Sequence, residues 1–219
     1  MTPDLKARRD RYFLPLADAL RPHGFELEKS TGHFVSKTEL GSARFWPIFM
    51  DAKPGWRIGL DIGVRVDQVE NALGRHSGIL PQASTKRSCT VGASVQSVGG
   101  CDRQTIEAIV KPGDDPEDAV PTAVDAFVAC AQPWSAGFSD LQDFDTFLNT
   151  DPFKPRSGAG LPVLRFARGL IVARLVGRPD YEALRQSYVD DLASRDGGFY
   201  LGSFMPLVEH LQRSSEGAI

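Results

Sequence analysis

The sequence lacks the residue patterns that usually mark an enzyme. It contains no G-x-S-x-G nucleophile elbow, no H-E-x-x-H helix and no G-x-x-x-x-G-K-[ST] phosphate loop. Its 4 histidines show no ligand spacing with one another or with the cysteines, so we expect no metal site. These absences favour a binding protein over an enzyme. We expect such a protein to need neither a cofactor nor a metal.

The chain also lacks a long apolar run. No run approaches the ~20 residues that a membrane-spanning helix needs. The polar segment Met1–Arg9 is not followed by the apolar stretch of a signal peptide. We therefore expect no membrane partner.

Cysteine is scarce. The 3 cysteines, Cys89, Cys101 and Cys130, are odd in number and widely spaced. This pattern argues against a disulfide framework and favours a reducing, cytoplasmic location. Cys101 follows two glycines in an expected turn, so a reactive thiol assisted by His33 or His76 stays open there.

Charge is distributed unevenly along the chain, although the net charge of -3 does not indicate a nucleic-acid-binding protein. Residues 102–151 contain 11 acidic and 2 basic residues, a balance of -9, whereas residues 152–178 contain 6 basic residues and no acidic one. One interpretation is that these blocks are solvated faces of amphipathic helices. The other is an acidic surface that attracts a basic partner protein. The residues proposed for such contacts are Asp114, Asp115, Glu117 and Asp118.

The first helix is expected from Thr2 or Asp4 to about Leu20, with a kink at Pro15. Its first turns carry four basic residues: Lys6, Arg8, Arg9 and Arg11. A nucleic-acid-binding surface built on them is a further hypothesis, which the acidic middle of the chain argues against.

The remaining patterns predict an α+β fold. Residues 25–96 resemble strands with hairpin-sized connections, which implies an antiparallel sheet. Apolar stripes predict five helices. The first begins either at Asp115-Pro116 or at Pro121 and is expected to end at Pro133, and the others lie near residues 139–148, 161–176, 179–192 and 203–211. The expected architecture is an antiparallel sheet with an N-terminal helix and a C-terminal helical half packed on it. We place a boundary between subdomains 1–112 and 113–219, within one compact unit.

The segment Trp56–Val66 carries the clearest strand signal. Every second residue of it is apolar, an unbroken alternation that predicts one buried face. On the opposite face two glycines separate Arg57, Asp61 and Arg65, which lie about 13 Å apart in succession. This spacing is too wide for one compact catalytic site and suits an extended partner. Two alternatives remain: a solvated face with cross-strand ion pairs, or a face covered by the helical half.

Short motifs in three parts of the chain resemble a family of bacterial domains of unknown function. They are Ala17–Phe25 followed by Gly32–Phe34, the strand Ile58–Val64, and the segment from Gln132 to Leu148, which begins Gln132-Pro133-Trp134. In this family a helix ends in an HGF turn and an aromatic-bearing hairpin follows. The resemblance covers about two-thirds of the chain. Some members are thought to be immunity proteins, which neutralise toxins delivered between competing bacteria, so the resemblance implies that function. It supplies no catalytic motif.

Together these features predict a non-enzymatic cytoplasmic binding protein of the immunity type, which covers the active cleft of a cognate toxin. An acidic surface would steer it onto a basic toxin domain. The contacts would come either from the acidic residues of 114–118 or from Arg57, Asp61 and Arg65. The alternative is an enzyme or a small-anion-binding protein that uses the sheet groove, with Arg57 and Arg65 gripping the anion.

Overall fold

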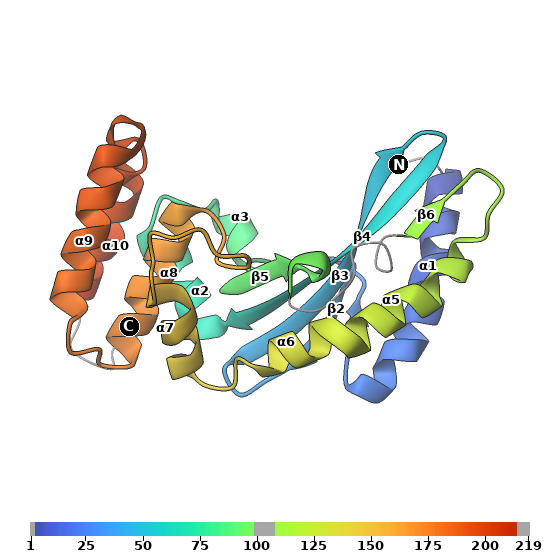
Figure 1. Ribbon diagram of the computed structural model, residues 1–219, viewed down its shortest axis with the longest axis horizontal. Helices are drawn as coiled ribbons and strands as arrows, with labels where there is room; N and C mark the ends of the chain where they lie inside the picture. The colour runs from blue at the N-terminus through green and yellow to red at the C-terminus, as the bar shows by residue number, and fades with distance from the viewer. Residues whose placement is uncertain (1–2, 99–107, 214–219) are drawn as a thin grey trace. The chain divides into compact units, whose positions relative to one another are not determined.

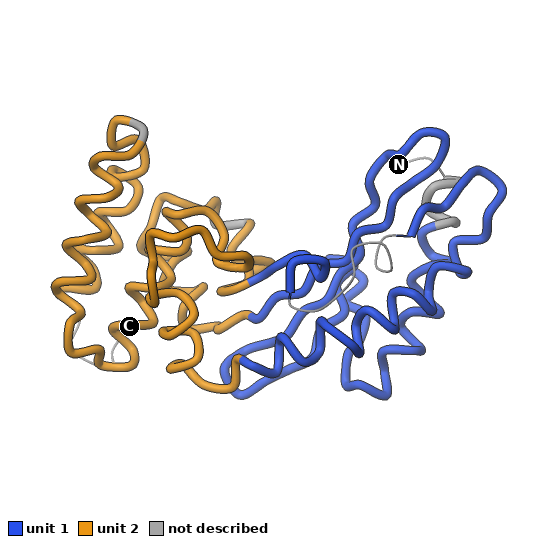
Figure 2. The backbone as a smooth tube through the Cα atoms, in the orientation of Figure 1, with its two compact units in different colours: residues 1–64, 92–137 blue, residues 65–91, 138–219 orange. Residues whose placement is uncertain are grey.

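The computed structural model describes residues 3–98 and 108–213, apart from the side chains of residues 3–8, 82, 83 and 196 (Figure 1). It has 54% helix and 20% strand, with an antiparallel sheet and helices at both ends, so the expected α+β class is confirmed. The chain divides into two compact units. Residues 1–64 and 92–137 form unit 1, and residues 65–91 and 138–219 form unit 2 (Figure 2). The boundary placed between residues 112 and 113 falls inside unit 1.

Six strands of the described chain form one sheet. They are β1 (Glu26–Glu28), β2 (His33–Lys37), β3 (Gly41–Ala52), β4 (Gly55–Val66), β5 (Val91–Ser94) and β6 (Ala108–Val110). The hydrogen-bonded order is β1-β2-β3-β4-β5, and β6 also pairs with β4. Strands β2 and β3 are antiparallel with Phe34 opposite Phe45, and β4 and β6 are antiparallel with Arg57 opposite Ile109.

Strand β4 has the buried face that its alternation predicts. Five of its apolar residues are buried: Ile58, Leu60, Ile62, Val64 and Val66. The strand begins with Gly55 because the backbone of β6 comes very close there. A Cβ atom added to Gly55 would lie 2.1 Å from the carbonyl oxygen of Val110, so any larger residue would displace β6.

Helix α1 (Pro3–Leu20) packs Tyr12, Leu16 and Leu20 into the same core as the sheet of unit 1. A second helical stretch of unit 1 consists of η3 (Pro116–Ala119), α5 (Val120–Ala126), the π-helix η4 (Phe127–Ala131) and α6 (Gln132–Ala136). Phe127 is fully buried, and its ring centroid lies 5.2 Å from that of Phe45. The described part of unit 1 also has two short 3-10 turns, η1 (Arg21–His23) and η2 (Val95–Ser97).

The helical stretch does not end at Pro133, contrary to the sequence prediction. Pro133 lies in the first turn of α6, directly after the π-helix η4. Proline has no amide hydrogen to donate, and the change to wider π turns just before it accommodates the ring without ending the helix. The chain therefore stays helical as far as Ala136.

Unit 2 is built mainly from helices. They are α2 (Asp67–His76), α3 (Gln82–Thr85), α7 (Leu141–Asn149), α8 (Pro162–Leu175), α9 (Tyr181–Ser194), the 3-10 turn η5 (Arg195–Gly198) and α10 (Leu201–Arg213). Helix α8 is central, because ten of its fourteen residues are buried and α2, α7, α9 and α10 all pack against it. Gly177, with a φ of 64°, lies between α8 and α9 and allows the turn that joins them.

Helix α2 was not expected, because residues 25–96 were all interpreted as strand-like. It follows β4 directly, and its N-cap residue, Val66, offers no side-chain cap. The helix therefore starts without a capping residue, although Asp67 and Glu70 place negative charge in its first turn. Its buried residues Val69, Ala72 and Leu73 do follow helical spacing, which is the signal that identifies it.

A buried ion pair joins α2 to α8. The carboxylate of Glu70 is fully buried and accepts hydrogen bonds from Arg168 Nε at 2.8 Å and Arg168 Nη2 at 3.1 Å. The hydroxyls of Ser88 and Thr90 donate to the same carboxylate. Each carboxylate oxygen thus has two donors, as a buried charge requires.

A second buried network joins α7, α8 and α9. The side-chain amide of Asn149 donates to the Asp145 carboxylate at 2.6 Å and to the Gly169 carbonyl oxygen at 3.0 Å. Its own oxygen accepts a hydrogen bond from the Tyr188 hydroxyl at 2.7 Å. A Cβ atom on Gly169 would lie 2.2 Å from the Asn149 oxygen, so this network requires glycine at that position.

Candidate functional site

The four acidic residues Asp114, Asp115, Glu117 and Asp118, which we call the acidic turn, are all exposed on unit 1. They follow β6 and lead into η3. Asp114 accepts a hydrogen bond from the Lys111 amide at 2.8 Å, and Asp115 accepts one from the Glu117 amide at 3.1 Å. These bonds fix the backbone of the turn and cap η3, so the carboxylates of Asp114 and Asp115 are held in place.

Asp115 also forms an ion pair with Arg11 of α1, at 3.4 Å. The Arg11 side chain is 67% exposed and that of Asp115 44%, so the pair contributes little to stability. It therefore leaves most of the negative charge of the acidic turn directed toward solvent.

The charge blocks of the sequence do not form two opposed surfaces. In the basic block, Arg165 and Arg168 are buried, and Arg178 pairs with the buried carboxylate of Asp145 at 2.8 Å. Asp145 itself belongs to the acidic block. Part of the asymmetry along the chain is thus neutralised inside unit 2, while the acidic turn remains exposed on unit 1.

Arg57 and Asp61 lie on unit 1, on the face of β4 opposite its apolar residues. Arg57 is exposed and lies directly across from Ile109 of β6, whose side chain is 60% exposed. Residues opposite each other in a pair of strands share a face, so these two side chains are neighbours. Asp61 is half-buried, and this burial raises the pKa of its carboxyl group to about 6.

Arg65 is not exposed beside Arg57 and Asp61, which corrects its assignment as a partner contact. It lies in unit 2 and is 5% exposed. Its Nη1 donates to the carbonyl oxygens of Thr85 and Ser88, and its Nε donates to Asp67 at 2.6 Å. The residues between α3 and β5 cover this end of the strand face. Arg57 and Arg65 therefore do not form a joint grip for an anion.

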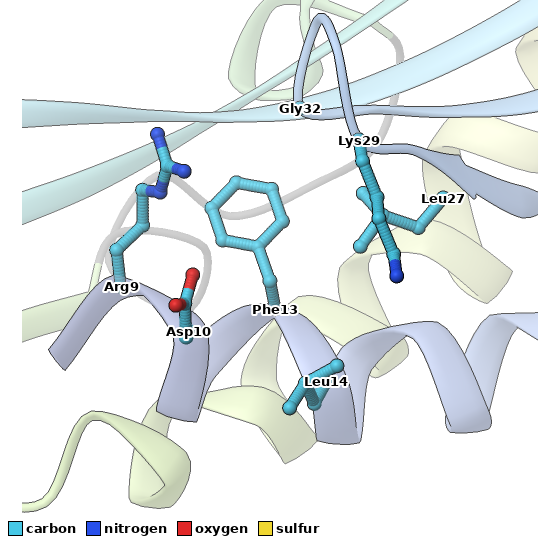
Figure 3. A pocket seen from close by; sticks show the side chains of 7 residues that line it. All are labelled: Arg9, Asp10, Phe13, Leu14, Leu27, Lys29 and Gly32. Carbon is cyan, nitrogen blue, oxygen red and sulfur yellow. The ribbon is translucent and has the colours of Figure 1, made fainter. Parts of the chain in front are cut away.

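Two hollows open in unit 1 around Arg9 of α1, and sequence reasoning did not find them. The first, of about 460 Å³, is lined by Arg9, Asp10, Phe13, Leu14, Leu27, Lys29 and Gly32 (Figure 3). The second, of about 430 Å³, is lined by Arg9, Pro47, Ile48, Phe49, Met50, Asp51 and Trp56. Both volumes are typical of small-ligand sites. The sequence places Arg9 in a basic first helix but does not reveal the hollows, because strands distant from it in the sequence form their other walls.

Exposed apolar side chains gather at these hollows. Leu14, Ile48 and Met50 line them and are three of the five large exposed apolar residues among those described in unit 1. Patches of this kind commonly bind another molecule. The hollows are therefore a second candidate site, separate from the acidic turn.

The described residues give no sign of a metal centre. Among residues 3–98 and 108–213, no group of three or more histidine, cysteine, aspartate or glutamate side chains is placed to hold an ion. Cys89 forms no disulfide, but Cys130 is disulfide-bonded, which the cysteine pattern of the sequence did not predict. Spacing along a chain does not show which distant cysteines meet. Cys101 lies outside the described residues.

Over the same described ranges, no helix combines the length and the apolar character needed to cross a bilayer. Comparison of the chain with protein-family models, curated proteins and solved structures found no match. The resemblance to immunity-type domains thus rests on its short motifs.

Proposed function

We propose that this protein is a non-enzymatic binding protein that recognises a protein partner through the acidic turn. The observation that carries the proposal is the presence of four exposed carboxylates within five residues, two of which, Asp114 and Asp115, are held by the turn's own hydrogen bonds. A fixed group of like charges speeds the approach of an oppositely charged surface and disfavours partners of the same sign. The partner surface is therefore basic.

Two features of unit 1 add to this proposal. Ile109, on the strand that leads into the acidic turn, offers an exposed apolar contact of the kind that interfaces bury. Arg57 beside it supplies a polar contact on the same face. Asp61 is the third member of this set; Arg65 is not part of it, because it is buried.

The partner that we propose is a basic bacterial toxin domain whose active cleft the protein covers. This step is supported by the resemblance to immunity-type domains. A cytoplasmic location belongs to the same proposal. Because Cys130 is disulfide-bonded, the cysteines no longer favour a reducing compartment. The proposed cytoplasmic location therefore depends on the resemblance.

The test is affinity capture from a lysate of the source organism with three baits, at low and high salt, read by mass spectrometry. The baits are the wild type, a turn-neutral variant and a control-neutral variant. The turn-neutral variant carries Asp114→Asn, Asp115→Asn, Glu117→Gln and Asp118→Asn, which keeps the capping oxygens. The control-neutral variant removes the same number of charges from exposed residues of unit 2, with Asp151→Asn, Glu182→Gln, Asp190→Asn and Glu209→Gln.

We expect one stoichiometric protein, captured by the wild type and the control-neutral variant at low salt and lost with the turn-neutral variant. A protein captured equally by all three baits would exclude the acidic turn as the contact. If no bait captures a protein, the binding function itself is wrong. The toxin assignment is tested separately by expressing the captured protein in bacteria, where it should stop growth unless this protein is present.

A further inference from the structure

We infer that the first hollow of unit 1 binds a small organic anion, with one carboxylate or phosphate group held by Arg9 and an aromatic or branched apolar body. The inference goes beyond the proposed protein partner and does not depend on it. It rests on the state of the Arg9 side chain, on the charges that line the hollow and on its apolar walls.

Arg9 has an unused hydrogen-bond donor at the hollow. Its Nε is shielded from solvent but has no hydrogen-bond partner in the part of the chain that the structure describes. The guanidinium lies over the ring of Phe13, with Cζ 5.6 Å from the ring centroid. That contact stabilises the positive charge but supplies no hydrogen-bond acceptor for the N–H groups. A buried donor without an acceptor is destabilising, and a ligand oxygen at this position would remove that cost.

The charges favour an anion in the first hollow over the second. Among the described side chains, Arg9 and Lys29 line the first hollow with a single carboxylate, that of Asp10. Figure 3 shows Arg9 and Asp10 rising from α1, and Lys29 on the hairpin segment on the other side of Phe13. In the second hollow the charge of Arg9 is balanced by that of Asp51. The first hollow thus has one excess positive charge, which suits a ligand with one negative group.

The body of the ligand meets an apolar and well-supported surface. Phe13 is 8% exposed, and its ring stacks on that of Phe34 at 5.8 Å with an interplanar angle of 16°. The turn at Gly32 rests on the same ring, because a Cβ atom added there would lie 3.6 Å from it. Leu14 and Leu27 provide further apolar lining. This combination of one cation and an apolar surface selects an amphipathic anion over a free inorganic ion.

The test is titration of the full chain with three probes that share a phenyl ring: phenylacetate, phenyl phosphate and neutral 2-phenylethanol. The readouts are the NMR shift of the Gly32 amide, which lines the hollow, and the thermal midpoint. Gly113, in the exposed turn after β6, is the remote reference amide. We expect saturable shifts at Gly32 with one or both anions, little change at Gly113, and at least tenfold weaker binding of the neutral probe. A preference between the two anions distinguishes a carboxylate from a phosphate ligand.

Arg9→Met is the decisive variant, since it keeps an apolar stem and removes the charge. It should weaken anion binding at least tenfold and should unfold at the same or a higher temperature than the wild type without ligand, because a buried unpaired donor is lost. Arg21→Met, which removes an exposed arginine paired with Asp18 at the end of α1, is the control and should bind as the wild type does. Equal binding of neutral and anionic probes, unchanged binding by Arg9→Met, or no saturable shift at Gly32 would each overturn the inference.

Discussion

Removal of the Arg168 guanidinium is expected to destabilise unit 2 strongly. Glu70 is fully buried, and Arg168 supplies two of its four donors, at 2.8 and 3.1 Å. In Arg168→Met the carboxylate keeps only the hydroxyl donors of Ser88 and Thr90 and has no counter-charge in this pair. Breaking one partner of a buried ion pair costs about 3–5 kcal/mol, a large share of the roughly 5–15 kcal/mol that stabilises a typical domain.

The double variant Glu70→Leu/Arg168→Met separates the loss of an ion pair from the loss of packing. A buried pair replaced by apolar side chains of similar size is often neutral in stability, so the double variant should be more stable than Arg168→Met by about 2 kcal/mol or more. Urea unfolding followed by far-ultraviolet circular dichroism measures both variants. Trp46, Trp56 and Trp134 all lie in unit 1, so tryptophan fluorescence reports that unit and identifies which one unfolds first. If Arg168→Met loses less than about 1 kcal/mol, or the double variant is the least stable, the account of this pair is wrong.

Two further predictions concern single positions. Burial raises the pKa of Asp61 from 3.8 to about 6, so the folded state holds this proton more tightly and stability falls as the pH rises from about 4 to about 6. Asp61→Asn should therefore be more stable than the wild type near pH 7 and similar to it near pH 4 in urea unfolding, and equal effects at both pH values would contradict this. Gly169→Ala should lose about 1–3 kcal/mol because its Cβ would lie 2.2 Å from the Asn149 oxygen. The control Gly202→Ala, in open space on α10, should gain up to about 1 kcal/mol, and an unchanged thermal midpoint for Gly169→Ala would refute the clash.

The fold could be predicted where local patterns decide the structure. The alternation of β4 and the helical spacing of the apolar residues of α9 identify those elements, because one buried face imposes a period, whereas α8 is recognisable as a long and strongly apolar segment. Helix α2 was missed because Val66 gives no capping signal and the helix follows a strand directly. The prediction that the helix ends at Pro133 was wrong, because a π-helix just before a proline has no simple sequence signature.

The candidate site was predictable only in part, because burial depends on contacts between distant segments. The alternation of residues along the strand places Arg57, Asp61 and Arg65 on one face of it. Yet Arg57 is exposed, whereas Arg65 is buried and donates a hydrogen bond to the Thr85 carbonyl oxygen. The acidic turn was recognisable from its composition and is exposed. The position of Arg9 between two hollows was not, since the walls come from strands that the sequence does not place beside α1.

The most direct test of the central claim is the association rate of the captured partner at increasing ionic strength, measured with the wild type, the turn-neutral variant and the control-neutral variant. Recognition through the acidic turn predicts a rate that falls steeply with salt for the wild type and the control. It also predicts a rate lower by about tenfold or more at low salt for the turn-neutral variant. Equal rates for the turn-neutral variant and the wild type at every salt concentration would contradict the account.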